Sequence, residues 1–249
     1  MSGRLIGVGV GPGDPELMTL KAARTLASAD VVAYFAKEGH RGNARTIVSA
    51  HLRNGVTELP LLYPVTTEIP KDCSRYRDAI RDFFDASAAA VAAHLDQDRS
   101  VAVISEGDPM FYGSYMHLHA RLAHRYPTEI VAGVTGMAGC WSMAGAPIAQ
   151  GDDIFVVLPG TLPEDELGRR LGEADAAVVM KLGRNLPKVR RALAQAGLLE
   201  RAIYVERGTM ANAVMMRLVD KTDDRAPYFA VVLVPGWAPK WGPEQEPTS

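Results

Sequence analysis

The chain has 249 residues, 47% of them hydrophobic and 22% charged, and a formal net charge of −2 at pH 7. These values are typical of a globular protein with one broad core or two smaller ones. A charge near zero, without basic arms, argues against a nucleic-acid-binding protein. The longest apolar run, near residues 88–93, is too short to span a bilayer, and we expect no signal peptide. We therefore expect a cytoplasmic protein with no membrane or nucleic-acid partner.

The two cysteines, Cys73 and Cys140, do not have the spacing of a metal site. We expect two free thiols in a reducing cytosol. The chain also has no cluster of histidines and aspartates, so the sequence predicts no metal bound by the protein.

Hydrophobic periodicity predicts alternating strands and helices in the first half of the chain. Leu5–Val10 is apolar on both faces, as a central parallel strand should be. Further strands are expected at 31–35, 56–61, 100–105 and 129–132. Helices are expected at 16–29, at 44–52, along a stripe from Ile80 to Leu95, and around Met116, His119 and Leu122. This alternation indicates an α/β fold with a parallel sheet.

A break in the pattern at 146–152, where Pro147 and Gly151 stand beside two aspartates, indicates a domain boundary. We assign residues 1–146 to a first domain and residues 147–249 to a second. In the second, helices are expected at 164–171 and 187–196, and strands at 154–158, 176–182, 202–206, 213–219 and 228–234.

Three glycine-rich turns directly follow predicted strands of the first domain, at 11–15, 106–113 and 133–136. Glycine permits positive φ and lets another group approach the bare main chain, and proline fixes the backbone between glycines. In parallel sheets, ligands bind outside the carboxyl ends of the strands. The turns therefore predict a ligand site at this edge.

The first turn does not fit the dinucleotide fingerprint Gly-x-Gly-x-x-Gly. From any starting glycine, the third position falls on Pro12, Asp14 or Glu16. No Gly-Lys-Ser/Thr follows, which excludes a P-loop. Carboxylates here would repel a diphosphate, whereas Asp14 and Asp108 suit hydroxyl, amino or sulfonium groups. An S-adenosyl group meets this description, and a dinucleotide-binding oxidoreductase is the weaker alternative.

Five segments, taken together, resemble the motifs of the tetrapyrrole (corrin/porphyrin) methylases. In chain order they are 9–22, 106–114, 133–139, 181–184 and 206–209. The resemblance implies two α/β domains with S-adenosyl-L-methionine between them, S-adenosyl-L-homocysteine as product, and a homodimer. The first domain would hold the substrate, and the second would complete the cofactor site.

Within the family, Ser-Glu-Gly-Asp-Pro at 105–109 and Met-Lys-Leu-Gly-Arg at 180–184 resemble the branch that methylates C20 of precorrin-2 in cobalamin biosynthesis. Uroporphyrinogen methylases instead have Gly-Gly-Asp-Pro, so Glu106 departs from their pattern and its role stays open. A cobalt-containing substrate and other tetrapyrrole methylases of this pathway are alternatives. Further alternatives are modification of ribosomal RNA or of a histidine, and binding without catalysis.

Site residues carry over from the matching motifs. The expected cofactor contacts are Pro12, Glu106, Gly107, Asp108, Phe111, Thr135, Gly136, Leu182 and Gly208. Leu182 could instead be plain core, and Thr135 could cap a helix, which would not exclude contact.

The implied substrate has many carboxylates and should meet cationic side chains. The expected substrate-binding residues are Lys37, Arg41, Arg45 and Tyr112. His40 belongs to the same cluster after the second predicted strand, Lys181 and Arg184 flank the later motif, and solvated surface is the alternative for each cation. A proton must leave the methylated carbon, so a base would help. Glu106, Tyr112, His117 and His119 are candidates, and none is assigned.

Overall fold

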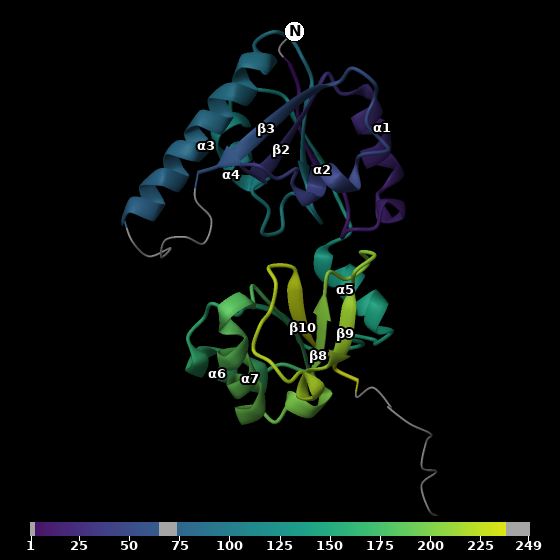
Figure 1. Ribbon diagram of the computed structural model, residues 1–249, viewed down its shortest axis with the longest axis vertical. Helices are drawn as coiled ribbons and strands as arrows, with labels where there is room; N and C mark the ends of the chain where they lie inside the picture. Colours follow the sequence, from purple (N-terminus) through teal and green to yellow (C-terminus); the bar gives the residue numbers. More distant parts are fainter. Residues whose placement is uncertain (1–2, 65–73, 238–249) are drawn as a thin grey trace, which may run out of the picture. The chain divides into compact units, whose positions relative to one another are not determined.

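The computed structural model describes residues 3–64 and 74–237, so Cys73 lies outside the described residues. Its contacts divide the chain into two compact units, Met1–Gly136 and Met137–Ser249 (Figure 1). Each unit contains one five-stranded sheet covered by helices. The predicted α/β fold class is confirmed.

The sheet of the first unit is parallel throughout and has the strand order β3-β2-β4-β1-β5. Its strands are β1 (Leu5–Gly9), β2 (Val31–Lys37), β3 (Thr57–Tyr63), β4 (Val101–Ser105) and β5 (Thr128–Val131). Every residue of β1 and β4 is buried. This burial on both faces explains why both strands are nearly continuous apolar runs.

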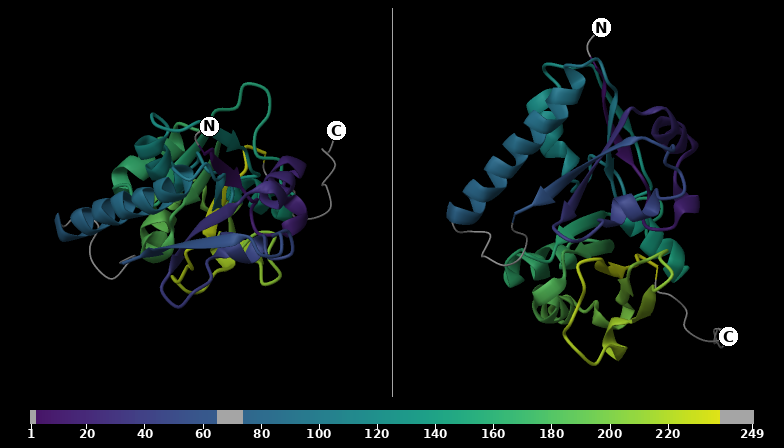
Figure 2. Two further views of the ribbon diagram at one scale, coloured as in Figure 1. Left: turned by 90° about the horizontal axis from the view of Figure 1, so that it is seen from above. Right: turned by 45° about the horizontal axis from the view of Figure 1, so that its top comes forward.

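Four helices cover the two faces of this sheet (Figures 1 and 2). They are α1 (Leu20–Ser28), α2 (Asn43–Ile47), α3 (Ser74–Leu95) and α4 (Tyr115–Leu122). Successive side chains of a strand point to opposite faces. Val103 therefore packs in the core with α3 and α4, whereas Ala102 and Ile104 pack in the core with α1 and α2.

The sheet of the second unit is mixed, with the strand order β6-β7-β10-β8-β9. Its strands are β6 (Phe155–Pro159), β7 (Ala176–Met180), β8 (Ile203–Glu206), β9 (Val214–Arg217) and β10 (Ala230–Val234). β10 is antiparallel to both β7 and β8, so the carboxyl ends of β7 and β8 lie at the same edge. One core of this unit includes α6 (Glu164–Gly172) and α7 (Leu186–Gln195), and another includes α5 (Gly136–Ala144).

Several expected boundaries differ from the structure, and three of these differences have a clear physical reason. The helix expected at 16–29 is a 3-10 turn, Pro15–Leu17, followed by α1, because Thr19 is extended and its side chain accepts from the Ala22 amide. β3 ends at Tyr63 instead of residue 61, and it tolerates Pro60 because it is an edge strand. The unit boundary falls after Gly136 instead of residue 146, because α5 packs on the second sheet through residues such as Cys140 and Met143.

Candidate functional site

The three glycine-rich turns of the first unit meet at one edge of its sheet. They follow β1, β4 and β5, which are parallel neighbours. Gly11 and Gly107 form a bridge in which the Gly107 amide donates to the Gly11 carbonyl at 2.7 Å, and the Gly11 amide to the Gly107 carbonyl at 3.4 Å. The sequence thus correctly indicates that these turns come together.

Backbone packs directly on backbone at this edge. A Cβ added at Gly133 would lie 2.1 Å from the Gly107 carbonyl oxygen, and one added at Gly9 would lie 2.6 Å from the same oxygen. Gly107 itself has φ +71° and also lies close to the Gly136 amide. Pro12 is buried in the first turn. These glycines therefore serve the contact between turns, and not solely the approach of a ligand.

Asp108 joins the second and third turns. Its Oδ1 accepts from the Met110 amide at 2.8 Å, and its Oδ2 accepts from the Gly133 amide at 3.0 Å. Both carboxylate oxygens thus bind main chain, and a negatively charged acceptor makes such bonds strong. Asp108 positions the edge of the site, whatever contact it makes with a ligand.

Glu106 is a half-buried carboxylic acid at the end of β4. Burial raises the pKa of its carboxyl to about 7, and a hydrogen bond from the Asn43 side chain opposes this shift. Asn43 is the first residue of α2, directly after Gly42 at φ +75°. Glu106 is thus partly ionised near neutral pH and can gain or lose a proton there. The sequence analysis did not identify Asn43 as a partner of Glu106. The only signal in the sequence is Gly42, which indicates that a helix begins there but not what the Asn43 side chain contacts.

Phe111 and Tyr112 lie at the outer part of the second turn. Their rings meet edge to face with centroids 4.9 Å apart, and Tyr112 is 46% exposed with φ +54°. Thr135 and Gly136 lie where the third turn enters α5, and Gly136 is exposed. These four residues present aromatic and peptide surface at the edge that holds Glu106 and Asp108.

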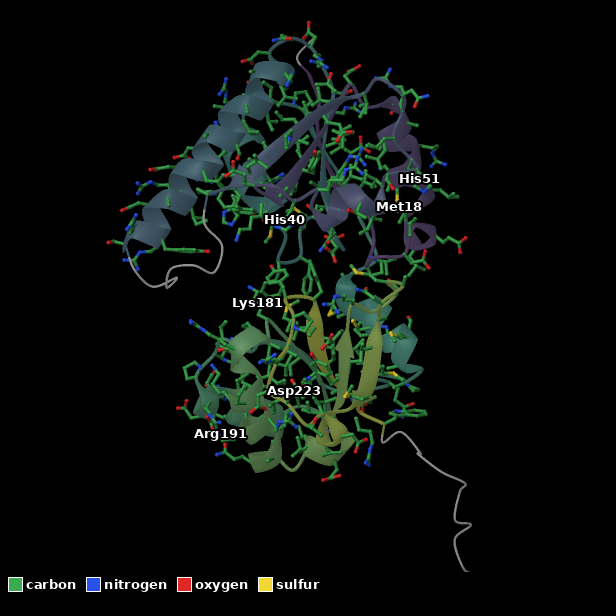
Figure 3. The ribbon with its side chains drawn as sticks, in the orientation of Figure 1. Met18, His40, His51, Lys181, Arg191 and Asp223 are labelled. Carbon is green, nitrogen blue, oxygen red and sulfur yellow. The ribbon has the colours of Figure 1, made fainter. Side chains whose placement is uncertain are left out.

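The expected cationic group is divided by the structure. Lys37, His40 and Arg41 are exposed at and after the end of β2, where Figure 3 labels His40. Arg45, in contrast, is 8% exposed, and its Nε and Nη2 donate to the two carboxylate oxygens of Glu58, each at 2.7 Å.

Binding of substrate by Arg45 therefore stays a prediction, and the structure shows a different role for this residue. It is a buried ion-pair partner, and its hydrogen bond to Glu58 lowers the pKa of that carboxyl. The pair anchors α2 to β3 on the sheet face that also carries Tyr34, which hydrogen-bonds Glu58. No signal in the sequence connects Arg45 with Glu58.

Two predicted residues of the second unit have distinct surroundings. Leu182 is 0% exposed and belongs to the core beneath α6 and α7. This burial favours the alternative of plain core, and the cofactor contact of Leu182 stays a prediction. Gly208 is buried against α5, where an added Cβ would lie 2.7 Å from the Cys140 sulfur.

Strained backbone gathers at the edge that holds the carboxyl ends of β7 and β8. Lys181 after β7 has φ +57°, and Arg207 and Thr209 after β8 have φ +48° and +72°. Residues other than glycine rarely adopt these angles, and a β-branched threonine does so least readily. Such strain gathers at functional sites. These loops contain the two second-domain motifs, and Figure 3 labels Lys181.

The candidate histidines have structural partners. His117 stacks on Phe84 with ring centroids 4.0 Å apart, and burial lowers its pKa. His119 Nδ1 lies 3.3 Å from the Tyr115 hydroxyl, and the Tyr115 ring occupies the space beside Gly7. Neither histidine is therefore assigned a role as base.

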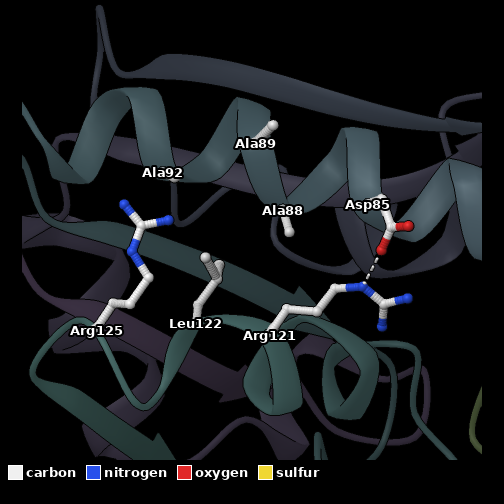
Figure 4. Close-up of a pocket in the computed structure, with 7 residues that line it drawn as sticks. All are labelled: Asp85, Ala88, Ala89, Ala92, Arg121, Leu122 and Arg125. Atoms are coloured by element: carbon white, nitrogen blue, oxygen red, sulfur yellow. Dashed lines mark hydrogen bonds and ion pairs between the residues drawn. The ribbon is translucent and has the colours of Figure 1, made fainter.

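A groove of about 250 Å³ is lined by residues of α3 and by residues at and after the end of α4 (Figure 4), and none of its lining residues belongs to the glycine-rich turns. Alanines from α3 line it, and Arg121 Nε donates to Asp85 Oδ1 at 2.7 Å at one end. Among residues 3–64 and 74–237, no group of acidic, histidine and cysteine side chains could hold a metal ion. None of the described helices is long and apolar enough to cross a membrane.

A model of the tetrapyrrole (corrin/porphyrin) methylase family matches residues 4–221. The chain is 64% identical over 235 residues to a precorrin-2 C(20)-methyltransferase of a Sinorhizobium species, covering 94% of this chain and 96% of that protein. It is 31% identical to a cobalt-precorrin-2 C(20)-methyltransferase of Salmonella typhimurium, covering 94% and 97%. A Thermus thermophilus uroporphyrin-III C-methyltransferase, solved with S-adenosylhomocysteine, has a TM-score of 0.63 at 24% identity, covering 93% and 97%.

Proposed function

Because this chain belongs to the tetrapyrrole (corrin/porphyrin) methylases, we propose that it transfers a methyl group from S-adenosyl-L-methionine to C20 of precorrin-2. The products are precorrin-3A, an intermediate of cobalamin biosynthesis, and S-adenosyl-L-homocysteine. The observation that carries this proposal is the 64% identity, across nearly the whole chain, to a relative named for this reaction. The S-adenosylhomocysteine complex of a structural relative supports the choice of cofactor.

The proposed cofactor site fits an S-adenosyl group better than a phosphate-bearing one. Two acidic side chains, Asp14 and Asp108, stand in the turns, and their oxygens already accept from main-chain amides. We assign the methyl donor to Pro12, Glu106, Gly107, Asp108, Phe111, Thr135 and Gly136 of the first unit and to Gly208 of the second. The donor supplies a methyl group on a cationic sulfur that leaves as a neutral thioether.

The reaction is a displacement in which the electron pair of the meso carbon forms the new carbon–carbon bond. The electron pair of the broken carbon–sulfur bond stays on sulfur, and the meso carbon then loses its proton. Rigid turns can supply much of the acceleration, because alignment of the three reacting atoms removes an entropic barrier. Glu106 is a candidate to receive the proton, since its carboxyl has a pKa of about 7.

The exposed cations Lys37 and Arg41, with Tyr112, are the proposed contacts for the carboxylates of the substrate. The deciding experiment incubates the purified protein with S-adenosyl-L-methionine and precorrin-2, either metal-free or loaded with cobalt, and locates the new methyl group by NMR. We expect methylation at C20, faster on the metal-free substrate. Faster transfer to the cobalt form would favour the reaction named for the Salmonella relative. Methylation elsewhere would reject the proposal.

We also propose that the protein is a homodimer of the cytoplasm. The family resemblance supports the dimer, and Cys140, a buried free thiol, fits a reducing compartment. Light scattering behind a sizing column tests the first point, and fractionation of the source cells tests the second.

A further inference from the structure

We propose that the hydrogen-bonded pair Tyr204–Glu206 positions the loop 207–209, and through it the contact of Gly208 with the methyl donor. This inference rests on the proposed function. Tyr204 and Glu206 would be positioning residues, since neither is placed against a ligand.

The pair connects the interior of the second unit with its strained edge. Tyr204 is 0% exposed, and its hydroxyl donates to Glu206 Oε1 at 2.6 Å. The other oxygen of the same carboxylate, Oε2, accepts from Arg207 Nη1 at 3.2 Å. Glu206 thus links a fully buried phenol to the first residue of the loop.

The phenol is itself fixed from a second direction. Lys221 Nζ lies 4.7 Å from the centroid of the Tyr204 ring and donates to Asp223 Oδ1 at 3.0 Å. A cation over an aromatic face is an attractive contact, which is stronger when water is excluded. Burial, followed by the nearby Glu206 carboxylate, raises the pKa of Tyr204. The hydroxyl therefore remains a hydrogen-bond donor over the working pH range.

The loop needs such support because its backbone is unfavourable. Arg207 and Thr209 both have positive φ, on either side of Gly208. Two main-chain bonds hold Arg207, whose amide donates to the Phe229 carbonyl at 2.7 Å and whose carbonyl accepts from the Met210 amide at 2.9 Å. The side chain of Arg207 is held by Glu206. Without the Tyr204 hydroxyl, Glu206 loses one of its two hydrogen-bond partners. The loop can then relax to the negative φ angles that residues other than glycine prefer.

A relaxed loop would bind the methyl donor less well, because apparent affinity falls with the fraction of molecules in the binding-competent state. The expected signature is weaker binding of the donor with little change in the chemical step. A core tyrosine that contributed stability alone would lower the melting temperature and leave affinity unchanged.

The test is Tyr204→Phe, which keeps the ring under Lys221 and removes the hydroxyl. The matched control is Tyr126→Phe, because Tyr126 is also buried and donates to a carboxylate, Asp96, at 2.6 Å, but belongs to the first unit. Titration calorimetry with S-adenosylhomocysteine should show a dissociation constant about 5–10 times higher for Tyr204→Phe and unchanged for Tyr126→Phe. The KM for S-adenosyl-L-methionine should rise by the same factor with kcat within twofold.

Unchanged binding by a folded Tyr204→Phe variant would overturn the inference. If that variant does not fold, Glu206→Gln decides, since it keeps an acceptor for Tyr204 and removes the charge that holds Arg207. We expect two- to threefold weaker binding for it, and unchanged binding would again overturn the inference. Wild-type protein that bound no S-adenosylhomocysteine would instead refute the proposed cofactor, which is a separate failure.

Discussion

The two units build their candidate site edges in opposite ways. In the first, close contact with the main chain of Gly107 leaves no space for a Cβ at Gly9 or Gly133. In the second, residues with full side chains, Arg207 and Thr209, hold the angles that glycine favours. The first edge is therefore fixed largely by steric exclusion, together with the two bonds of Asp108, whereas side-chain bonds at the second edge oppose strain. We expect substitutions to be severe in the first and graded in the second.

Gly133→Ala should have the largest effect. Its Cβ would lie 2.1 Å from the Gly107 carbonyl oxygen and 2.8 Å from the Gly9 Cα, and backbone cannot move aside cheaply. We expect a loss of about 4 kcal/mol in the free energy of unfolding, measured by urea denaturation. The control is Gly172→Ala at the end of α6, which meets nothing within 4 Å and should be neutral or stabilising. Equal effects would contradict the steric account.

Glu106→Gln should change how stability depends on pH. The folded state raises the pKa of this carboxyl from 4.5 to about 7, so the native protein binds more protons than the unfolded chain between those values. Wild-type stability should therefore fall through this window as pH rises, by about 3 kcal/mol. The glutamine variant lacks this loss, so its stability relative to that of the wild-type protein should increase from pH 4.5 to pH 7. A constant difference between the two would contradict the prediction.

Glu58→Gln provides the opposite sign. The hydrogen bond from Arg45 lowers the pKa of Glu58, so its contribution is present above pH 4.5 and is lost as pH falls through the lowered folded value. The wild-type protein should be more stable than this variant at neutral pH, and the difference in the free energy of unfolding should shrink in acid. Stability curves of both variants across pH 3–8 would separate the two cases.

Asp108→Asn should have an intermediate effect. One oxygen can still accept, but the new amide nitrogen would face either the Met110 or the Gly133 N–H. We expect a loss of about 1–2 kcal/mol in the free energy of unfolding, because one main-chain N–H loses a charged acceptor and would face an amide nitrogen. Asp153→Asn is the control, since Asp153 accepts from the Gln150 amide through one oxygen and can keep that bond. In chemical denaturation, the loss in the free energy of unfolding should be at least twice as large for Asp108→Asn as for Asp153→Asn.

Thr209→Asn should have the smallest effect and the opposite direction. Asparagine adopts positive φ more readily than a β-branched residue does, so the variant should be about 0.5 kcal/mol more stable. Binding of S-adenosylhomocysteine should stay within twofold of wild type. A destabilisation as large as that of Gly133→Ala would remove the distinction between the two edges.

Hydrophobic periodicity predicted most of the strands correctly. It also predicted that the three glycine-rich turns lie at one edge, because parallel neighbouring strands place their carboxyl ends together. It was insufficient where a remote partner decides. Arg45 is buried because Glu58 lies on the neighbouring strand, and Leu182 is core because α6 and α7 cover it. The predicted start of α1 was too early because Pro15 and Glu16 are residues typical of a first helical turn. In the structure they form a separate 3-10 turn, and Thr19 caps α1 instead.

The position of β1 has a consequence for biosynthesis of the protein. Leu5 pairs with Val101 and Thr128, so β1 is synthesised long before either of its two neighbours in the sheet. At typical translation rates of about 5–20 residues per second, synthesis from Leu5 to Thr128 takes about 6–25 seconds. During this time a wholly apolar segment stands unpaired, while β2 and β3 can already associate. The nascent chain should therefore depend on chaperones until β5 emerges.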